Sequence, residues 1–177
     1  MALPNDSASQ TYRIRSHHPG DIDIIISQHG SQYAKEFGWA ESFEAYTARL
    51  AADFLEKFDP AQESVFIAEL VETSKFLGSI ALFKHREQAN VAHLRLLLVD
   101  PAARGMGLGA TLINECVLFA RKRGYSKIIL GTFSVLEGAR RLYRRAGFQL
   151  MSTEEEKEYW GVRLVPEIWE LPLSREE

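Results

Sequence analysis

Residues 94–109 read LRLLLVDPAARGMGLG, and this stretch decides the fold. Residues 94–99 form the most apolar run of the chain, as expected for a strand in the middle of a sheet. Asp100 and Pro101 end the strand, and a glycine-rich loop follows. From Leu108 onward, apolar residues recur at helical spacing. The stretch therefore predicts a central strand, a glycine loop and a long helix in direct succession.

Signals on either side of this stretch predict further helices and strands. Helices are expected at residues 21–29, 43–57, 108–123 and 135–146, with Asp21 as the cap of the first. Strands are expected at residues 12–15, 65–70, 77–83, 92–99, 126–130, 148–151 and 168–173. The acidic residues Glu154, Glu155 and Glu156 are expected in a solvated loop.

These elements define the fold class as α/β, in its α+β form. The strand, loop, helix and strand between residues 92 and 130 predict a parallel pair, because parallel neighbours need such a crossover. The other strands follow one another closely, as in hairpins. We therefore expect a mixed, mostly antiparallel sheet with helices on both faces. One domain is expected at residues 11–174, behind a disordered lead-in at residues 1–10.

Composition and charge exclude several classes of protein. The chain has 177 residues, of which 46% are apolar and 25% charged, as in ordinary globular proteins. Its formal net charge of −3 opposes a general nucleic-acid binder, which needs a basic face. No apolar run reaches the ~20 residues that cross a membrane, and a single cysteine, Cys116, cannot form an internal disulfide. We expect a cytoplasmic protein without metal, nucleic-acid or membrane partners, and a homodimer is left open.

The glycine loop has a physical use in binding an anion. Glycines let the backbone approach a ligand closely, so that several N–H groups converge on a phosphate at the positive end of the next helix. Arg104 adds positive charge near the same anion. The loop lacks the G-x-G-x-x-G spacing of dinucleotide sites and the G-K-[ST] of phosphate loops. On the glycines alone, a tight strand-to-helix turn explains the loop equally well.

Two motifs together resemble the GNAT (Gcn5-related N-acetyltransferase) superfamily. Residues 104–109, with Arg104, Gly107 and Gly109, are similar to its R/Q-x-x-G-x-G/A pyrophosphate signature. Residues 139–148, ARRLYRRAGF, are similar to its A-x-x-x-Y-x-x-x-G-F segment. The pair is a much stronger signal than either motif alone.

The resemblance extends over nearly the whole chain, from about Tyr12 to Leu173. Residues 29–39 and residues 169–171, WEL, resemble the GNAT domain that is often fused to MarR-type regulators in bacteria. We expect no regulator domain within these residues.

The resemblance implies direct transfer of an acetyl group from acetyl-CoA to an amine, without a covalent enzyme intermediate. The residues that it implies for acetyl-CoA binding are Leu97, Leu98, Val99, Arg104, Gly105, Met106, Gly107, Leu108, Gly109 and Tyr143. Tyr143 stands where many GNATs have the general acid for the departing thiolate. A tyrosine with a pKa near 10 is protonated at neutral pH and can donate. The alternative is that Tyr143 only packs its ring.

The acceptor side offers three candidate bases, because the amine must lose a proton. Glu36, His29 and His93 are the candidates, acting directly or through water, and a solvated or structural role is the alternative for each. The expected acceptor-binding residues are Tyr33, Phe37, Trp39 and Trp160, for which ordinary packing is the alternative.

The sequence thus predicts an N-acetyltransferase for a small primary amine or an amino acid. A protein-lysine or N-terminal acetyltransferase is the first alternative, and a non-catalytic acyl-CoA-binding sensor is the second. Retention of Tyr143 favours catalysis over sensing.

Overall fold

The structure is a computed structural model that describes residues 11–173, so the lead-in expected at residues 1–10 and residue 174 lie outside the described residues. The helices are α1 (Asp21–Phe37), α2 (Glu41–Glu56), α3 (Leu108–Lys122) and α4 (Glu137–Arg145), with a 3-10 turn at Pro101–Ala103. The strands are β1 (Tyr12–Ser16), β2 (Ser64–Leu70), β3 (Phe76–Lys84), β4 (Val91–Val99), β5 (Lys127–Phe133), β6 (Gln149–Thr153), β7 (Lys157–Tyr159), β8 (Val162–Leu164) and β9 (Pro166–Pro172).

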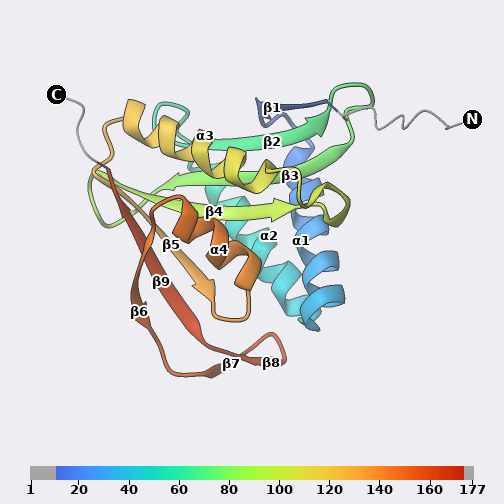
Figure 1. Cartoon of the computed structure of the whole chain (residues 1–177), viewed down its shortest axis with the longest axis vertical. Helices are drawn as coiled ribbons and strands as arrows, with labels where there is room; N and C mark the ends of the chain where they lie inside the picture. Colours follow the sequence, from blue (N-terminus) through green and yellow to red (C-terminus); the bar gives the residue numbers. More distant parts are fainter. Residues whose placement is uncertain (1–10, 174–177) are drawn as a thin grey trace, which may run out of the picture.

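Seven strands form one sheet in the order β1-β2-β3-β4-β5-β9-β6, with β4 in the centre (Figure 1). Among the described strands only β4 and β5 pair in parallel. All other neighbours in the sheet are antiparallel, and β7 pairs with β8 in a separate hairpin. The expected central strand and the mixed, mostly antiparallel sheet are confirmed.

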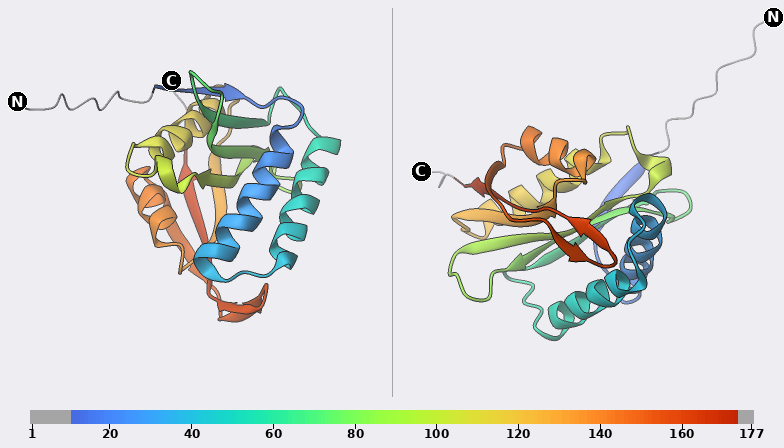
Figure 2. Two further views of the ribbon diagram at one scale, coloured as in Figure 1. Left: turned by 90° about the vertical axis from the view of Figure 1, so that its right-hand side faces the viewer. Right: turned by 90° about the horizontal axis from the view of Figure 1, so that it is seen from below.

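The helices cover both faces of the sheet, as expected. Figure 2 shows α1 and α2 on one side and α3 and α4 on the other. The apolar stripe of α3 faces the sheet, and Leu108, Leu112, Cys116 and Ala120 are each at most 2% exposed. On the opposite face, Ile25 of α1 and Phe54 of α2 pack against β2 and β3. None of the described helices has the length and apolar character needed to span a bilayer.

The first helix is longer than the sequence suggests, so the expected end at residue 29 is wrong. It continues through Gly30 and ends at Gly38, whose φ is 70° and whose N–H donates to the carbonyl of Ala34. Gly30 stays in the helix because it lets α1 approach α2: an added Cβ would lie 2.6 Å from Oε2 of Glu44. The longer helix carries residues 30–37 toward the site.

Asp21 is not the cap of this helix. Gly20 occupies the cap position, and Asp21 is the first helical residue. Its carboxylate accepts hydrogen bonds from the guanidinium of Arg15, at 2.6 and 3.0 Å, and from the N–H of His18 at 2.6 Å. The aspartate therefore ties the start of α1 to β1.

The β7–β8 hairpin is an element that the sequence analysis missed. Its turn consists of Trp160 and Gly161, with φ of 48° and 78°. A hairpin turn with positive φ at both central residues is of type I′, which usually calls for asparagine or glycine. A tryptophan gives no such signal. The N–H of Ala40 donates to the carbonyl of Trp160 at 2.9 Å, which fixes the hairpin beside the α1–α2 connection.

Candidate active site

The two parallel strands separate at the middle of the sheet. β4 pairs with β5 only from Val91 to His93. Beyond that point β4 contains a bulge: its register with β3 shifts, and Leu96 adopts a φ of 54°. The hydroxyl of Ser79 donates to the carbonyl of Leu96 at 3.0 Å and holds the bulge in place. Because a bulge bends its strand, the second half of β4 diverges from β5.

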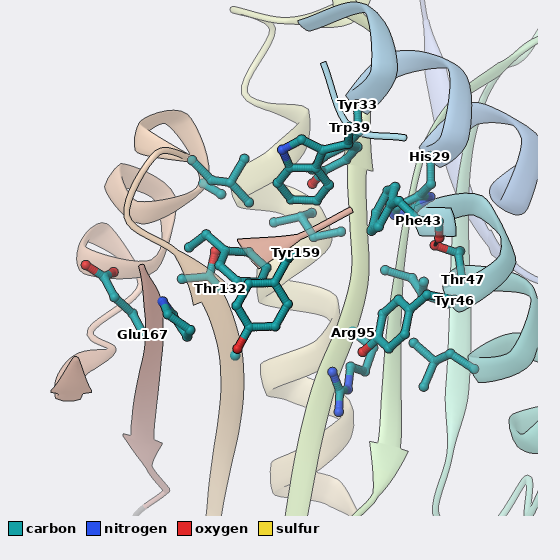
Figure 3. A pocket seen from close by; sticks show the side chains of 18 of the residues that line it. His29, Tyr33, Trp39, Phe43, Tyr46, Thr47, Arg95, Thr132, Tyr159 and Glu167 are labelled. Atoms are coloured by element: carbon teal, nitrogen blue, oxygen red, sulfur yellow. Dashed lines mark hydrogen bonds between the residues drawn. The ribbon is translucent and has the colours of Figure 1, made fainter. Parts of the chain in front are cut away.

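A cavity of about 420 Å³ lies where the strands diverge (Figure 3). The residues that line it come from α1, the α1–α2 connection, α2, β4, β5, α4 and the residue before it, the hairpin and β9. They are His29, Tyr33, Trp39, Phe43, Tyr46, Thr47, Leu50, Leu94, Arg95, Leu96, Leu97, Gly131, Thr132, Phe133, Leu136, Ala139, Tyr143, Tyr159, Trp160, Pro166, Glu167 and Ile168. A mainly apolar cavity with few polar groups is typical of a small-molecule site.

Aromatic side chains form most of one wall. The ring of Trp39 lies 4.6 Å from that of Tyr33, 4.7 Å from that of Phe43 and 4.8 Å from that of Trp160, between centroids. Three of the four residues expected to bind the acceptor, Tyr33, Trp39 and Trp160, thus line the cavity. The fourth, Phe37, packs behind them, 5.6 Å from Tyr33.

Tyr143 extends from α4 into the same cavity. Its side chain is only 6% exposed, and its hydroxyl has no hydrogen-bond partner within residues 11–173. Burial raises the pKa of this phenol above its usual value near 10, because the phenolate is poorly solvated there. The group is therefore protonated at neutral pH, and it belongs to a side chain that lines the cavity.

The glycine loop before α3 leaves several backbone N–H groups free to bind an anion. Gly105 and Gly107 have φ of 83° and 77°, which favour glycine, and a Cβ added at either would meet nothing within 4 Å. The N–H groups of Gly105, Met106 and Gly107 donate to no acceptor in the described part of the chain. They lie at the positive end of α3, next to the free N–H groups of its first turn. The loop therefore fits the pyrophosphate of a coenzyme.

Other residues of the motif have structural roles that the structure makes visible. A Cβ on Gly109 would lie 2.6 Å from Cδ1 of Leu142, so this glycine lets α3 approach α4 closely. The side chain of Leu108 is 2% exposed and packs in the core, while its backbone begins α3. Of the expected strand residues, Leu97 lines the cavity, and Leu98 is buried beside the partly buried Val99.

The guanidinium of Arg104 is already paired with a carboxylate. Its two terminal nitrogens bind the carboxylate of Glu36, at 2.6 and 3.1 Å. The pair lies in a second hollow, lined by residues of α1 together with Pro101 and Arg104. Glu36 is absent from the lining of the aromatic cavity. The structure thus brings one candidate base to the glycine loop and not to the cavity that Tyr143 lines.

Burial lowers the pKa of both histidine candidates, so both are neutral at pH 7. His29 lines the cavity, is 4% exposed, and its Nδ1 lies 2.8 Å from the carbonyl of Ile25. Burial lowers its pKa to about 4. His93 does not line the cavity. Burial first, and then the charge of Arg95, lower its pKa to about 3.

Two charged residues of the lining were not singled out by the sequence analysis. Glu167 of β9 is 3% exposed, and its Oε2 accepts from Arg140 at 3.0 Å and from the indole of Trp169 at 2.9 Å. Arg95 lies on β4, on the opposite side of the pocket in Figure 3. A charge inside the apolar run of residues 94–99 was the available signal for Arg95, whereas nothing local marks Glu167.

No cluster of three or more His, Cys, Asp or Glu side chains suited to a metal ion occurs in the part of the chain that the structure describes. The single cysteine, Cys116, is fully buried in α3, and burial raises its pKa well above the usual value. A thiol with a raised pKa is a poor nucleophile.

Comparison with known proteins agrees with this geometry. The model of the acetyltransferase (GNAT) family matches residues 31–148. An uncharacterised N-acetyltransferase of Schizosaccharomyces pombe is 30% identical over 134 residues, which are 74% of this chain and 78% of the relative. Glucosamine 6-phosphate N-acetyltransferase 1 of Oryza sativa is 30% identical over 148 residues, 78% of this chain and 82% of that protein.

A solved structure shows the same fold. A putative acetyltransferase from Salmonella typhimurium, solved with acetyl-CoA, superposes with a TM-score of 0.74. It is 18% identical and covers 93% of this chain and 95% of its own.

The chain therefore belongs to the GNAT acetyltransferase family. It is an N-acetyltransferase, and its acyl donor is acetyl-CoA. The family, the fold class, the enzyme class and the donor expected from the sequence are confirmed.

Proposed function

We propose that this acetyltransferase modifies the primary amine of a small molecule or an amino acid, with Tyr143 as the general acid. The position of Tyr143 carries the proposal. Its hydroxyl has no structural partner in residues 11–173, and its side chain lines a cavity of about 420 Å³ that is rich in aromatic residues. A structural tyrosine buried to 6% exposure usually donates a hydrogen bond to the protein, as Tyr125 does to Gln62 at 2.8 Å.

The reaction needs one bond formed, one broken and one proton moved at each end. The amine nitrogen forms a bond to the acetyl carbon, and the carbon–sulfur bond of the thioester breaks. The amine gives up a proton to a base or to water, the departing sulfur takes one from Tyr143, and the resulting Tyr143 phenolate regains a proton from solvent. N–H groups of the diverging half of β4, around Leu97, Leu98 and Val99, would polarise the thioester carbonyl.

The coenzyme end is assigned to the loop before α3. The N–H groups of Gly105, Met106 and Gly107 would bind the pyrophosphate, at the positive end of the helix. Arg104 would add its charge once it leaves Glu36. This assignment places the thioester near Leu97 and Tyr143, which line one cavity.

The weakness of the candidate general bases favours an acceptor whose amine has a low pKa. With pKa values lowered to about 4 and about 3, His29 and His93 are neutral at pH 7 but accept protons weakly. An α-amine with a pKa near 8 is about 10% neutral at pH 7, whereas a lysine-like amine near 10.4 is about 0.04% neutral. Glu36 would have to leave Arg104 before it could act.

The shape of the site supports a small acceptor. Tyr33, Trp39 and Trp160 line the cavity with their rings, with Phe37 packed behind them. An extended peptide needs an open groove. The relative from Oryza sativa carries a small sugar phosphate in its name, which agrees with an acceptor of this size.

A protein acceptor remains the second candidate, on one observation. Glu154, Glu155 and Glu156 are exposed beside the hairpin and would attract a lysine-rich tail. Two of these carboxylates already have local partners: Glu154 lies 3.8 Å from Lys157, and Glu156 lies 2.7 Å from Arg163. The acidic stretch is therefore a weaker argument than the aromatic cavity. A non-catalytic sensor would not explain why the buried hydroxyl of Tyr143 lacks a hydrogen-bond partner.

A competition experiment tests the proposal. The purified chain is incubated with acetyl-CoA and an equimolar mixture of small amines, amino acids, peptides with free N-termini and lysine-rich peptides, and acetylated products are identified by mass spectrometry. We expect the small amines or amino acids to be acetylated first. If only peptides are acetylated, the protein is instead a protein-lysine or N-terminal acetyltransferase. If acetyl-CoA binds tightly but no acetylated product forms, the protein is instead a non-catalytic acyl-CoA-binding sensor.

A further inference from the structure

Arg95 is the one side chain of the cavity lining, among the described residues, whose charge is not balanced. The lining contains two formally charged residues, Arg95 and Glu167. Glu167 is neutralised by Arg140 at 3.0 Å. Arg95 forms no ion pair with any residue that the structure describes. The lining therefore carries a net positive charge.

The guanidinium of Arg95 is also short of hydrogen bonds. Its Nε is buried and has no partner in residues 11–173. An unsatisfied buried N–H destabilises a protein, and a charged one does so more strongly. Other partly buried arginines of this chain are satisfied: Arg15 binds both Asp21 and Glu69, and Arg140 binds Glu167. Arg95 is thus an exception within the same protein.

The charge of Arg95 acts on the acceptor face of the sheet. Arg95 lies opposite Ala81 in the β3–β4 register, on the face that α1 and α2 cover. Figure 3 shows it on the same side of the pocket as Tyr46 of α2. Its charge contributes, after burial, to lowering the pKa of the nearby His93. The coenzyme loop lies elsewhere, at the start of α3.

We propose that the acceptor amine carries an oxyanion, a carboxylate or a phosphate, and that Arg95 binds this group inside the cavity. The inference rests on the small-molecule acetyltransferase function proposed above. A planar guanidinium pairs with a carboxylate or a phosphate through two parallel hydrogen bonds. Such an anion balances the positive charge that Arg95 brings to the lining.

The rest of the cavity defines the body of this acceptor. Apart from Arg95 and the occupied Glu167, the polar side chains of the lining are mainly hydroxyls, including those of Thr132 and Tyr46. Trp39, Phe43 and Trp160 offer aromatic faces. The expected acceptor therefore has an amine at one end, an apolar or weakly polar body, and one anionic group.

The test compares matched acceptors that differ only in the anion. The probes are an apolar α-amino acid, its carboxamide, its decarboxylated amine and an aminoalkyl phosphate of similar length, each assayed with acetyl-CoA for kcat/KM. We expect the wild-type enzyme to prefer an anionic probe over its neutral counterpart by about 10- to 100-fold, the scale of a hydrogen bond to a charged group. The amino acid and the phosphate arms tell the two sources of the oxyanion apart.

Variants assign the preference to Arg95. Arg95→Met should reduce the preference to about threefold or less by lowering kcat/KM for the anionic probes, while the neutral probes change little. Arg95→Lys should keep part of the preference. Arg121→Met removes an exposed arginine at the far end of α3 and should leave the preference intact. Acetyl-CoA affinity and the thermal unfolding midpoint check that each variant folds.

The possible outcomes separate this inference from the function on which it rests. Equal kcat/KM for neutral and anionic probes in the wild-type enzyme overturns the role of Arg95, even if Arg95→Met does not fold. A preference that survives in Arg95→Met also overturns it. Failure of every amine to accept an acetyl group contradicts the proposed function itself.

Discussion

Arg104 and Glu36 lie 68 residues apart in the chain and hold each other in a two-point ion pair, with N–O distances of 2.6 and 3.1 Å. One belongs to the coenzyme signature and the other to the last turns of α1. The side chain of Arg104 is 49% exposed and that of Glu36 28%, so the pair is weak enough to exchange. A coenzyme pyrophosphate would therefore compete with Glu36 for the same guanidinium.

Glu36→Gln should tighten acetyl-CoA binding by about two- to fivefold, because an exposed ion pair contributes roughly 0.2–1 kcal/mol. Isothermal titration calorimetry measures the affinity, and kcat with a good acceptor should change little. Glu44→Gln, on the neighbouring helix, serves as a charge-matched control. A fall in kcat of about 10²-fold would instead identify Glu36 as the general base.

Gly107→Glu should abolish acetyl-CoA binding, because it brings a side chain and a negative charge into the cradle before α3. Gly124→Glu is a closely matched control: Gly124 follows α3 at its other end, its φ of 76° is nearly that of Gly107 at 77°, and neither has an atom within 4 Å of an added Cβ. The backbone strain is thus the same in both variants. Equal acetyl-CoA affinities for the two variants would reject the loop as the coenzyme site.

Tyr143→Phe should lower kcat by about 10²-fold with little change in acetyl-CoA affinity, since it removes the proton donor and keeps the ring. Tyr125→Phe removes another buried hydroxyl, outside the cavity lining, and should leave kcat near the wild-type value. Steady-state kinetics of the two variants decide the point. Wild-type activity in Tyr143→Phe would mean that water or another group protonates the thiolate.

The pKa of His29 predicts how stability depends on pH. Folding lowers this pKa from 6.5 to about 4, so the unfolded chain binds the proton more tightly. The stabilisation is complete above pH 6.5 and is lost as the pH falls toward 4, by up to about 3 kcal/mol. His29→Asn should therefore show a shallower loss of unfolding free energy over this range in urea titrations. Parallel curves for His29→Asn and the wild-type protein would contradict the assignment.

Local patterns predict most of the fold because they depend on neighbours in sequence. The buried stripe of α3 and the central strand β4 follow from periodicity, and Gly124 after α3 follows from the positive φ that a helix stop requires. Gly30 suggests a helix end in the sequence, but it is there because α2 approaches α1 too closely for a side chain, and such a tertiary contact is not visible in a local pattern. The turn at Trp160 departs from turn preferences because the aromatic wall holds it.

The candidate site is only partly predictable for the same reason. The loop from Arg104 to Gly109 is a contiguous motif and is found by its spacing. The cavity needs the bulge at Leu96 and the divergence of β4 from β5, which no local pattern encodes. The pairing of Arg104 with Glu36, and the lack of a partner for Arg95, appear only when distant segments are brought together.

The central claim is that a small acceptor binds in the aromatic cavity while acetyl-CoA binds at the loop, and steady-state kinetics of Trp160→Ala test it most directly. Trp160 lines the cavity from the hairpin, is partly exposed, and lies away from the start of α3. We predict that the acceptor KM rises at least about tenfold while the acetyl-CoA KM stays within about twofold, because a truncated aromatic anchor is typically a loss of 1–2 kcal/mol or more. Leu118→Ala, at a 53% exposed position on α3, should change neither KM. Wild-type acceptor kinetics in a folded Trp160→Ala enzyme would contradict the account.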